Sequence, residues 1–209
     1  MMTMNSIPDH LTTPGDARTA PSLKRSVITG AIGFCLVSLC VFATVAFAQN
    51  WMYKHLSVYG AYLVWIALFI LLGGKALSPL VIGPRRPWRF YALFGAAFFA
   101  YGISWMEAYF TLPNTKGEWI GSLAGSVSMA LVFAAGFKAL RSTLVLSAVL
   151  FVANSIGYFG GLIFYSPLGE VTGLLVWGAF YGLCLGAGLG AVIYIAQSQR
   201  RRGQNNLDG

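Results

Sequence analysis

The last long apolar stretch of the chain, residues 171–196, reads VTGLLVWGAFYGLCLGAGLGAVIYIA and decides the fold class. It carries no charged residue, and Gly178, Gly182, Gly186 and Gly190 recur in it four residues apart. In a water-exposed helix each interior glycine costs about 1 kcal/mol relative to alanine. In a bilayer, a row of small residues lets a second helix approach closely where lipid supplies no hydrophobic drive. The stretch therefore predicts a transmembrane helix with one flat packing face.

The composition of the whole chain is that of a membrane protein. Of the 209 residues, 57% are hydrophobic and 10% are charged, whereas soluble domains carry about 25% charged residues. The net charge of +8 comes from short basic clusters between apolar stretches, so we expect no nucleic-acid partner. Cys35, Cys40 and Cys184 lie in apolar stretches without a C-x-x-C spacing. They predict neither a metal site nor a disulfide framework.

Six apolar stretches predict an all-α bundle of six transmembrane helices without a soluble domain. At 1.5 Å per residue, each is about long enough to cross the roughly 30 Å hydrocarbon layer. Proline, serine and threonine dominate residues 1–25, which we expect to be a disordered tail. Residues 197–209 are expected to form a basic tail. The predicted spans are 26–48, 58–77, 90–111, 119–137, 143–165 and 171–196.

Lysine and arginine are concentrated on one side of the predicted bundle. With a cytoplasmic amino terminus, the inner side holds twelve of them and the outer side only Lys54 and Lys116. This asymmetry predicts that both termini are cytoplasmic, and a bacterial-type inner membrane is the simplest location. Arg85, Arg86 and Arg89, in a loop with three prolines, are expected to contact anionic lipid headgroups.

The first apolar stretch has two interpretations. Basic residues, an apolar core and Ala46-Phe47-Ala48 together resemble a secretory signal that would be cleaved after Ala48. The apolar core of about 20 residues is longer than the roughly 7–15 of a typical signal. We therefore favour a retained helix and six spans, with cleavage and five spans as the alternative.

The sequence contains no recognisable catalytic or cofactor motif. The only histidines are His10 in the amino-terminal tail and His55 in an outer loop, so no di-histidine metal site is expected inside the membrane. Ser-His-Asp triads, H-E-x-x-H and P-loop motifs are also missing. We expect neither enzymatic activity nor a cofactor.

Glu107 and Asn154 are the candidate pathway or binding residues. Glu107 lies about one turn from the outer end of its span, where it either faces a water-filled cavity or reaches the interface. Asn154 lies near the middle of the fifth span and either contacts a solute or bonds to a neighbouring helix. Glu118 and Glu170 lie at the beginning of predicted helices, where we expect their negative charge to interact favourably with the helix dipole. Tyr101, Tyr109 and Tyr158 complete the set of candidate residues.

The glycines define expected packing faces and a second functional interpretation. We expect Gly157, Gly160 and Gly161 to bring the fifth span against the glycine-rich sixth, and Gly121 and Gly125 to form a smaller notch on the fourth. The first interpretation is a small-solute or ion permease or channel. The alternative is a non-catalytic membrane subunit or scaffold. Its glycine ridge would pack against a partner protein or a second copy of the chain.

Overall fold

The protein is helical throughout the part that the computed structural model describes, residues 21–81, 87–112 and 114–205, and no strand occurs there. This confirms the predicted all-α class. The helices are α1 (Leu23–Leu77), η1 (Ser78–Leu80), α2 (Pro87–Thr111), α3 (Thr115–Gly136), η2 (Leu140–Ser142), α4 (Thr143–Leu168) and α5 (Glu170–Asn205). Arg85, Arg86 and residues 1–20 fall outside the described residues.

Both terminal helices extend beyond the apolar stretches that predicted them. α1 begins at Leu23, because Ser22 caps it by accepting a hydrogen bond at 3.2 Å from the backbone N–H of Arg25. α5 continues past Ala196 to Asn205, and no proline interrupts it there. The helices therefore include the last residues of the predicted amino-terminal tail and the first residues of the predicted carboxyl-terminal tail.

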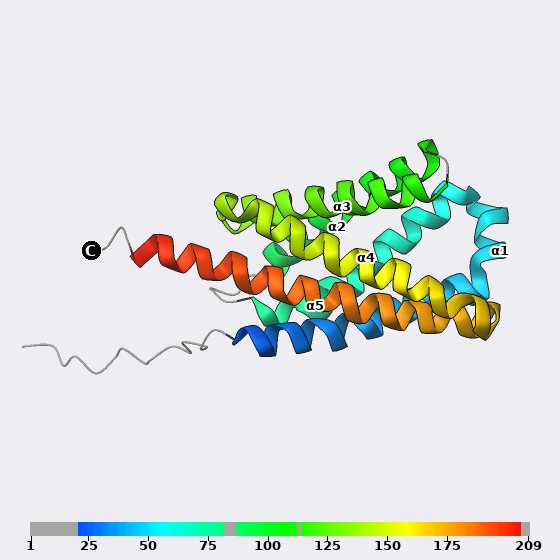
Figure 1. Ribbon diagram of the computed structural model, residues 1–209, viewed down its shortest axis with the longest axis horizontal. Coiled ribbons are helices and arrows are strands. Elements are labelled where there is room, and N and C mark those ends of the chain that lie inside the picture. Colours follow the sequence, from blue (N-terminus) through cyan, green and yellow to red (C-terminus); the bar gives the residue numbers. More distant parts are fainter. Residues whose placement is uncertain (1–20, 82–86, 113, 206–209) are drawn as a thin grey trace, which may run out of the picture.

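The long helix α1 contains the first two predicted spans. Ser57 is the residue inside it with non-helical backbone angles (φ 62°, ψ 172°). The Ser57 hydroxyl accepts a hydrogen bond at 3.4 Å from the backbone N–H of Gly60, as the N-cap of a new helix does. In Figure 1 the chain crosses the end of the bundle and then runs back. We call residues 23–56 the first arm of α1 and residues 58–77 the second arm.

Four stretches of the described chain are long and apolar enough to cross a membrane. They are Leu23–Leu80, Thr115–Gly136, Leu140–Tyr165 and Glu170–Gln199. The first includes both arms of α1. α2 is not among the four, and it carries tryptophan, tyrosine and glutamate among its apolar residues. The structure thus shows several membrane-compatible helices, and six crossings remain a prediction.

The helices run along one long axis, and the start of α1 and the end of α5 lie at the same end of the bundle (Figure 1). We call this the terminal end. The opposite, distal end carries Ser57 and the turns between α2 and α3 and between α4 and α5. Lys54 and Lys116 belong to the distal end. The other lysines and arginines with described side chains belong to helix ends at the terminal end: Lys24, Arg25, Lys75, Arg89, Lys138 and Arg141. The side of the membrane that each end faces is a prediction.

The glycine ridge of α5 packs against the first arm of α1. A Cβ atom built on Gly182 would lie 2.6 Å from Ser38 Cβ and 2.7 Å from the backbone oxygen of Phe34, and one on Gly178 would lie 2.5 Å from Phe42 Cβ. Gly186 and Gly190 face the backbone of Gly30 and Ser26 in the same way. The absence of side chains therefore brings two antiparallel backbones of the same chain into direct contact.

The remaining predicted packing glycines lie at two other helix contacts. Gly157, Gly160 and Gly161 of α4 face α5. Gly160 and Gly161 meet the rings of Phe180 and Trp177, whereas Gly157 meets the backbone of Tyr181. The glycine ridge of α5 is turned toward α1 instead. Gly121 and Gly125 of α3 face Trp105 and Tyr101 of α2. Small residues on one helix thus receive aromatic side chains from its neighbour.

Candidate functional site

A network of five polar side chains lies buried between α2, α3, α4 and α5. The Tyr101 hydroxyl donates a hydrogen bond to Asn154 Oδ1 at 2.6 Å, and it lies 2.9 Å from the Tyr181 hydroxyl. Asn154 Nδ2 donates to Ser122 Oγ at 2.8 Å, and Ser122 Oγ lies 2.8 Å from Ser155 Oγ. Asn154 and Ser122 are fully buried, and the other three side chains nearly so. One hydrogen-bonded unit therefore ties together four helices.

A second layer of polar and aromatic side chains lies one helical turn toward the distal end. Each helix contributes a residue four positions from its network residue, about 6 Å along the axis. The Tyr158 hydroxyl donates to Glu118 Oε1 at 3.3 Å, and the Tyr158 ring contacts the rings of Trp105 and Trp177 at centroid distances of 5.6 and 5.4 Å. Trp105 corresponds to Tyr101, Glu118 to Ser122, Tyr158 to Asn154, and Trp177 to Tyr181.

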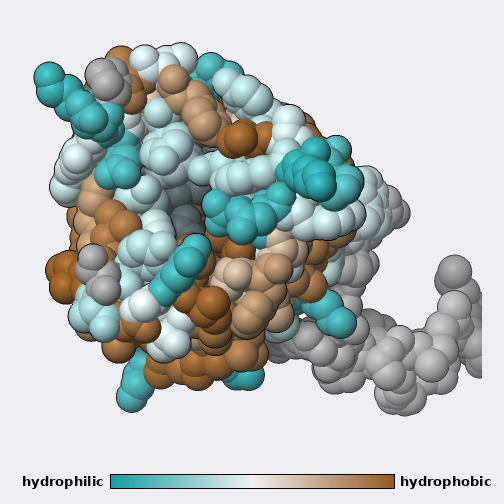
Figure 2. All heavy atoms as spheres, turned by 90° about the vertical axis from the view of Figure 1, so that its right-hand side faces the viewer, coloured by the Kyte–Doolittle hydropathy of each residue, from teal (hydrophilic) through white to brown (hydrophobic). Residues whose placement is uncertain are grey.

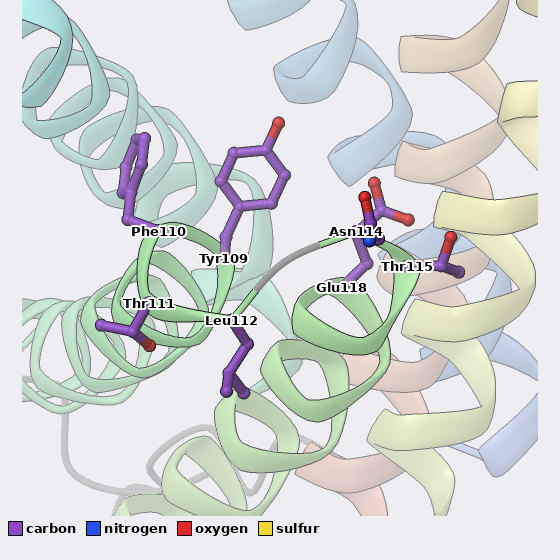
Figure 3. Close-up of a pocket in the computed structure, with 7 residues that line it drawn as sticks. All are labelled: Tyr109, Phe110, Thr111, Leu112, Asn114, Thr115 and Glu118. Carbon is purple, nitrogen blue, oxygen red and sulfur yellow. The ribbon is translucent and has the colours of Figure 1, made fainter.

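A hollow opens at the distal end beside this second layer. Its volume is about 590 Å³, within the range of pockets that bind small molecules. Tyr109 and Glu118 stand on opposite sides of it in Figure 3. Seen from the distal end, Figure 2 shows a depression near the middle, bordered by residues of intermediate and hydrophilic character. The lining residues are Tyr109, Phe110, Thr111, Leu112, Asn114, Thr115 and Glu118.

The opposite direction from the network is closed by apolar packing. One turn toward the terminal end, the positions equivalent to the network residues are Ala97, Ser126, Leu150 and Leu185, all at most 1% exposed. Ser126 Oγ has no hydrogen-bond partner in the described structure. One further turn toward the terminal end, the space is filled by four fully buried side chains: Phe94, Met129, Leu146 and Leu189. The two layers of polar side chains therefore extend from the distal end to mid-bundle and stop there.

The structure separates the two principal candidate residues. Asn154 is at the centre of the buried network, whereas Glu107 is exposed on α2 and does not line the hollow. The Glu107 backbone oxygen accepts a hydrogen bond from Thr111 Oγ1 at 2.5 Å. Tyr101 belongs to the network. Tyr109 lines the hollow, and Tyr158 donates a hydrogen bond to Glu118, which also lines it. Of the three glutamates of the spans, Glu118 alone lines the hollow.

Several residues of this site were not singled out from the sequence. Tyr181 and Ser122 join the network, and Trp105 and Trp177 join the second layer. Glu118 was interpreted as an interaction with the helix dipole. Spacing offers a signal, because Glu118 and Ser122, like Asn154 and Tyr158, are four residues apart and share a helix face. Which face of each helix turns inward depends on its packing against the neighbouring helices.

Neither a metal site nor an ion pair for the basic loop emerges from the described residues. No group of three or more histidine, cysteine, aspartate and glutamate side chains is placed to hold a metal ion there. Arg89 is exposed at the terminal end, and its guanidinium carbon lies 5.7 Å from the ring centroid of Trp88. Both side chains are placed as interfacial anchors are, and contact with lipid headgroups stays a prediction.

Comparison with protein-family models, with curated proteins and with solved structures finds no match for this chain.

Proposed function

We propose that this membrane protein is a permease for a small solute, which enters from the hollow at the distal end and reaches the polar network at mid-bundle. The observation that carries the proposal is the stacking of two polar layers on the inward faces of four helices, from Glu118 and Tyr158 to Tyr101, Asn154 and Ser122. Polar side chains in the interior of a membrane bundle commonly mark the route of a solute. They also give a passing solute hydrogen-bonding partners in place of water.

The closed side of the network favours a permease over an open channel. Leu150, Leu185 and the layer beyond them leave the network sealed toward the terminal end. Passage would require the helices to move, so that the network opens toward one end at a time. In the empty state the network residues bond to one another. A bound solute would replace some of these hydrogen bonds with its own. Such alternating access is the general mechanism of secondary transporters.

The scaffold interpretation loses the surface on which it was based. The first arm of α1 covers the glycine ridge at Gly178, Gly182, Gly186 and Gly190. A partner protein would have to bind through another face. We therefore place the permease first.

Purified protein reconstituted into liposomes tests the proposal. Stopped-flow light scattering measures the entry of a panel of neutral and ionic solutes, with protein-free liposomes as the baseline. We expect at least one solute to enter faster than in this baseline. The Asn154→Leu variant should reduce that rate at least fivefold. The matched control is Ser104→Ala, because the 2.9 Å hydrogen bond between Ser104 and Ser128 also joins two helices but lies outside the network.

Two results would contradict the permease. One is a rate equal to that of protein-free liposomes for every solute. The other is a rate that Asn154→Leu leaves unchanged while the variant lowers thermal stability, because Asn154 would then only hold helices together.

A further inference from the structure

A row of contacting aromatic rings begins at the hollow, where Tyr109 and Phe110 belong to its lining. Phe110 contacts Tyr109, Tyr109 stacks on Trp105, Trp105 contacts Tyr158, and Tyr158 contacts Trp177, with successive ring centroids 4.9 to 5.6 Å apart. We call these five residues the aromatic wall. Three of them come from α2, and Tyr158 and Trp177 come from α4 and α5. The wall begins in the hollow at Tyr109 and Phe110 and continues inward toward the network.

Glu118 is a carboxylate whose charge is not balanced inside the protein. It lines the hollow and is partly buried. Its one hydrogen bond comes from the neutral Tyr158 hydroxyl at 3.3 Å, and within the described structure no lysine or arginine pairs with it. A carboxylate in a membrane protein is costly unless it is paired or hydrated. The helix dipole of α3 compensates only part of that charge.

The chemistry of the wall selects the kind of cation. Aromatic faces attract alkylammonium and quaternary ammonium groups, and cages of such rings beside a carboxylate recognise them. Metal ions such as Ca²⁺ and Mg²⁺ need six or more oxygen ligands, including water. The described residues offer no cluster of acidic side chains here. The hollow of about 590 Å³ also exceeds what a bare ion needs.

We propose that the hollow binds a small organic cation, with the ammonium charge facing Glu118 and the alkyl groups against Tyr109 and Phe110. This assignment deepens the proposed function, because it names the solute class that would enter the permease. As a statement about transport it rests on that function, and as a statement about binding it stands alone.

Choline and its uncharged carbon analogue 3,3-dimethylbutan-1-ol form a matched pair of probes. Isothermal titration calorimetry on the full chain in lipid nanodiscs should show saturable binding of choline, with an affinity at least tenfold higher than that of the analogue. Potassium chloride at equal ionic strength serves as the reference. Equal binding of the two probes, or no saturable binding of choline, would overturn the proposal.

Variants locate the charge. Glu118→Gln should weaken choline binding at least tenfold, and Tyr109→Leu at least threefold. Glu170→Gln is the matched control, because Glu170 also lies in the first helical turn at the distal end but is exposed and outside the hollow. Its affinity should stay within twofold. A loss of the same size in both glutamate variants would mean that choline is attracted by the overall negative charge of the distal end. This result would overturn the site.

Measuring choline entry into proteoliposomes separates this inference from the proposed function. Choline binding that depends on Glu118, without faster entry of choline or of any other solute of the panel, would support the site and contradict the permease. Entry of a neutral solute that depends on Asn154, without choline binding, would support the permease and overturn the organic-cation site. Circular dichroism of each variant establishes that it is folded.

Discussion

Tyr101 holds the buried network together through one hydroxyl group. This hydroxyl donates to Asn154 Oδ1 and also bonds to the Tyr181 hydroxyl, so that it links α2 to both α4 and α5. Hydrogen bonds between transmembrane helices contribute about 0.6 kcal/mol each on average. Two of them therefore add little to the free energy of unfolding, but they fix the rotation of three helices relative to one another.

The change Tyr101→Phe tests this at the scale of the residue. It keeps the ring, which packs against Gly125, and removes both hydrogen bonds. We expect the free energy of unfolding to fall by about 1 kcal/mol, measured by SDS denaturation in mixed micelles of lipid and detergent. Tyr91→Phe is the control, because the Tyr91 ring packs on Gly74 and its hydroxyl makes no hydrogen bond within the described residues. Equal stability of the two variants would mean that the network contributes nothing to folding.

The individual residues of the site were only partly predictable. Asn154 stood out because a strongly polar side chain in an apolar stretch needs a partner. Glu107 stood out for the same reason, but a single turn near a helix end is enough to reach the exposed surface, which is where the structure places it. Sequence spacing cannot tell these outcomes apart, because the inward face of each helix depends on its neighbours.

At the scale of the element, the contact between α5 and the first arm of α1 is set by glycine. Gly182, Gly186 and Gly190 face backbone atoms of α1, and Gly178 faces the Phe42 side chain. Close approach of this kind stabilises membrane helices through van der Waals contacts. The sequence predicts a flat packing face on this helix. It did not identify α1 as the partner, because small residues mark a surface without naming what covers it.

The change Gly182→Ala should disturb this contact. The added Cβ would lie 2.7 Å from both Cys35 Cα and the Phe34 backbone oxygen, so the two backbones must move apart. Gly33→Ala is the control, because its Cβ would find its nearest neighbour, Ala76 Cβ, at an ordinary 3.4 Å. Both variants gain the same helix propensity. We expect Gly182→Ala to be less stable than the control by about 1–3 kcal/mol, the cost of overpacking.

Denaturation in mixed micelles measures that difference as well. A stability equal to that of Gly33→Ala would show that α1 does not cover the ridge. The ridge would then be free for a partner, as the scaffold interpretation requires.

At the scale of the whole molecule, α1 decides how many times the chain crosses the membrane. Helical content and apolar length were predictable from composition, since each apolar stretch is long enough for a span. The chain's return at Ser57 was predictable only as a short polar loop. The structure instead keeps the segment between the two predicted spans helical up to that residue, so crossings must be counted from exposure of the arms to each side of the membrane.

Single cysteines count these crossings. In a background with Cys35, Cys40 and Cys184 replaced by serine, each of four exposed lysines becomes the only cysteine: Lys54, Lys75, Lys116 or Lys138. Sealed right-side-out vesicles are treated with a maleimide that cannot cross the bilayer, before and after permeabilisation. If both arms of α1 cross, Lys54→Cys and Lys116→Cys react from outside. Lys75→Cys and Lys138→Cys then react only after permeabilisation.

The two ways in which this labelling can fail have different meanings. If Lys54→Cys and Lys75→Cys react from the same side, the arms of α1 do not cross separately, and the six-span prediction is wrong. If all four positions react from the sides opposite to those expected, the three crossings between them stand and the cytoplasmic placement of the termini is wrong. The second outcome would also put the twelve basic residues outside, against the charge asymmetry of membrane proteins, and would place the hollow and Glu118 on the cytoplasmic side.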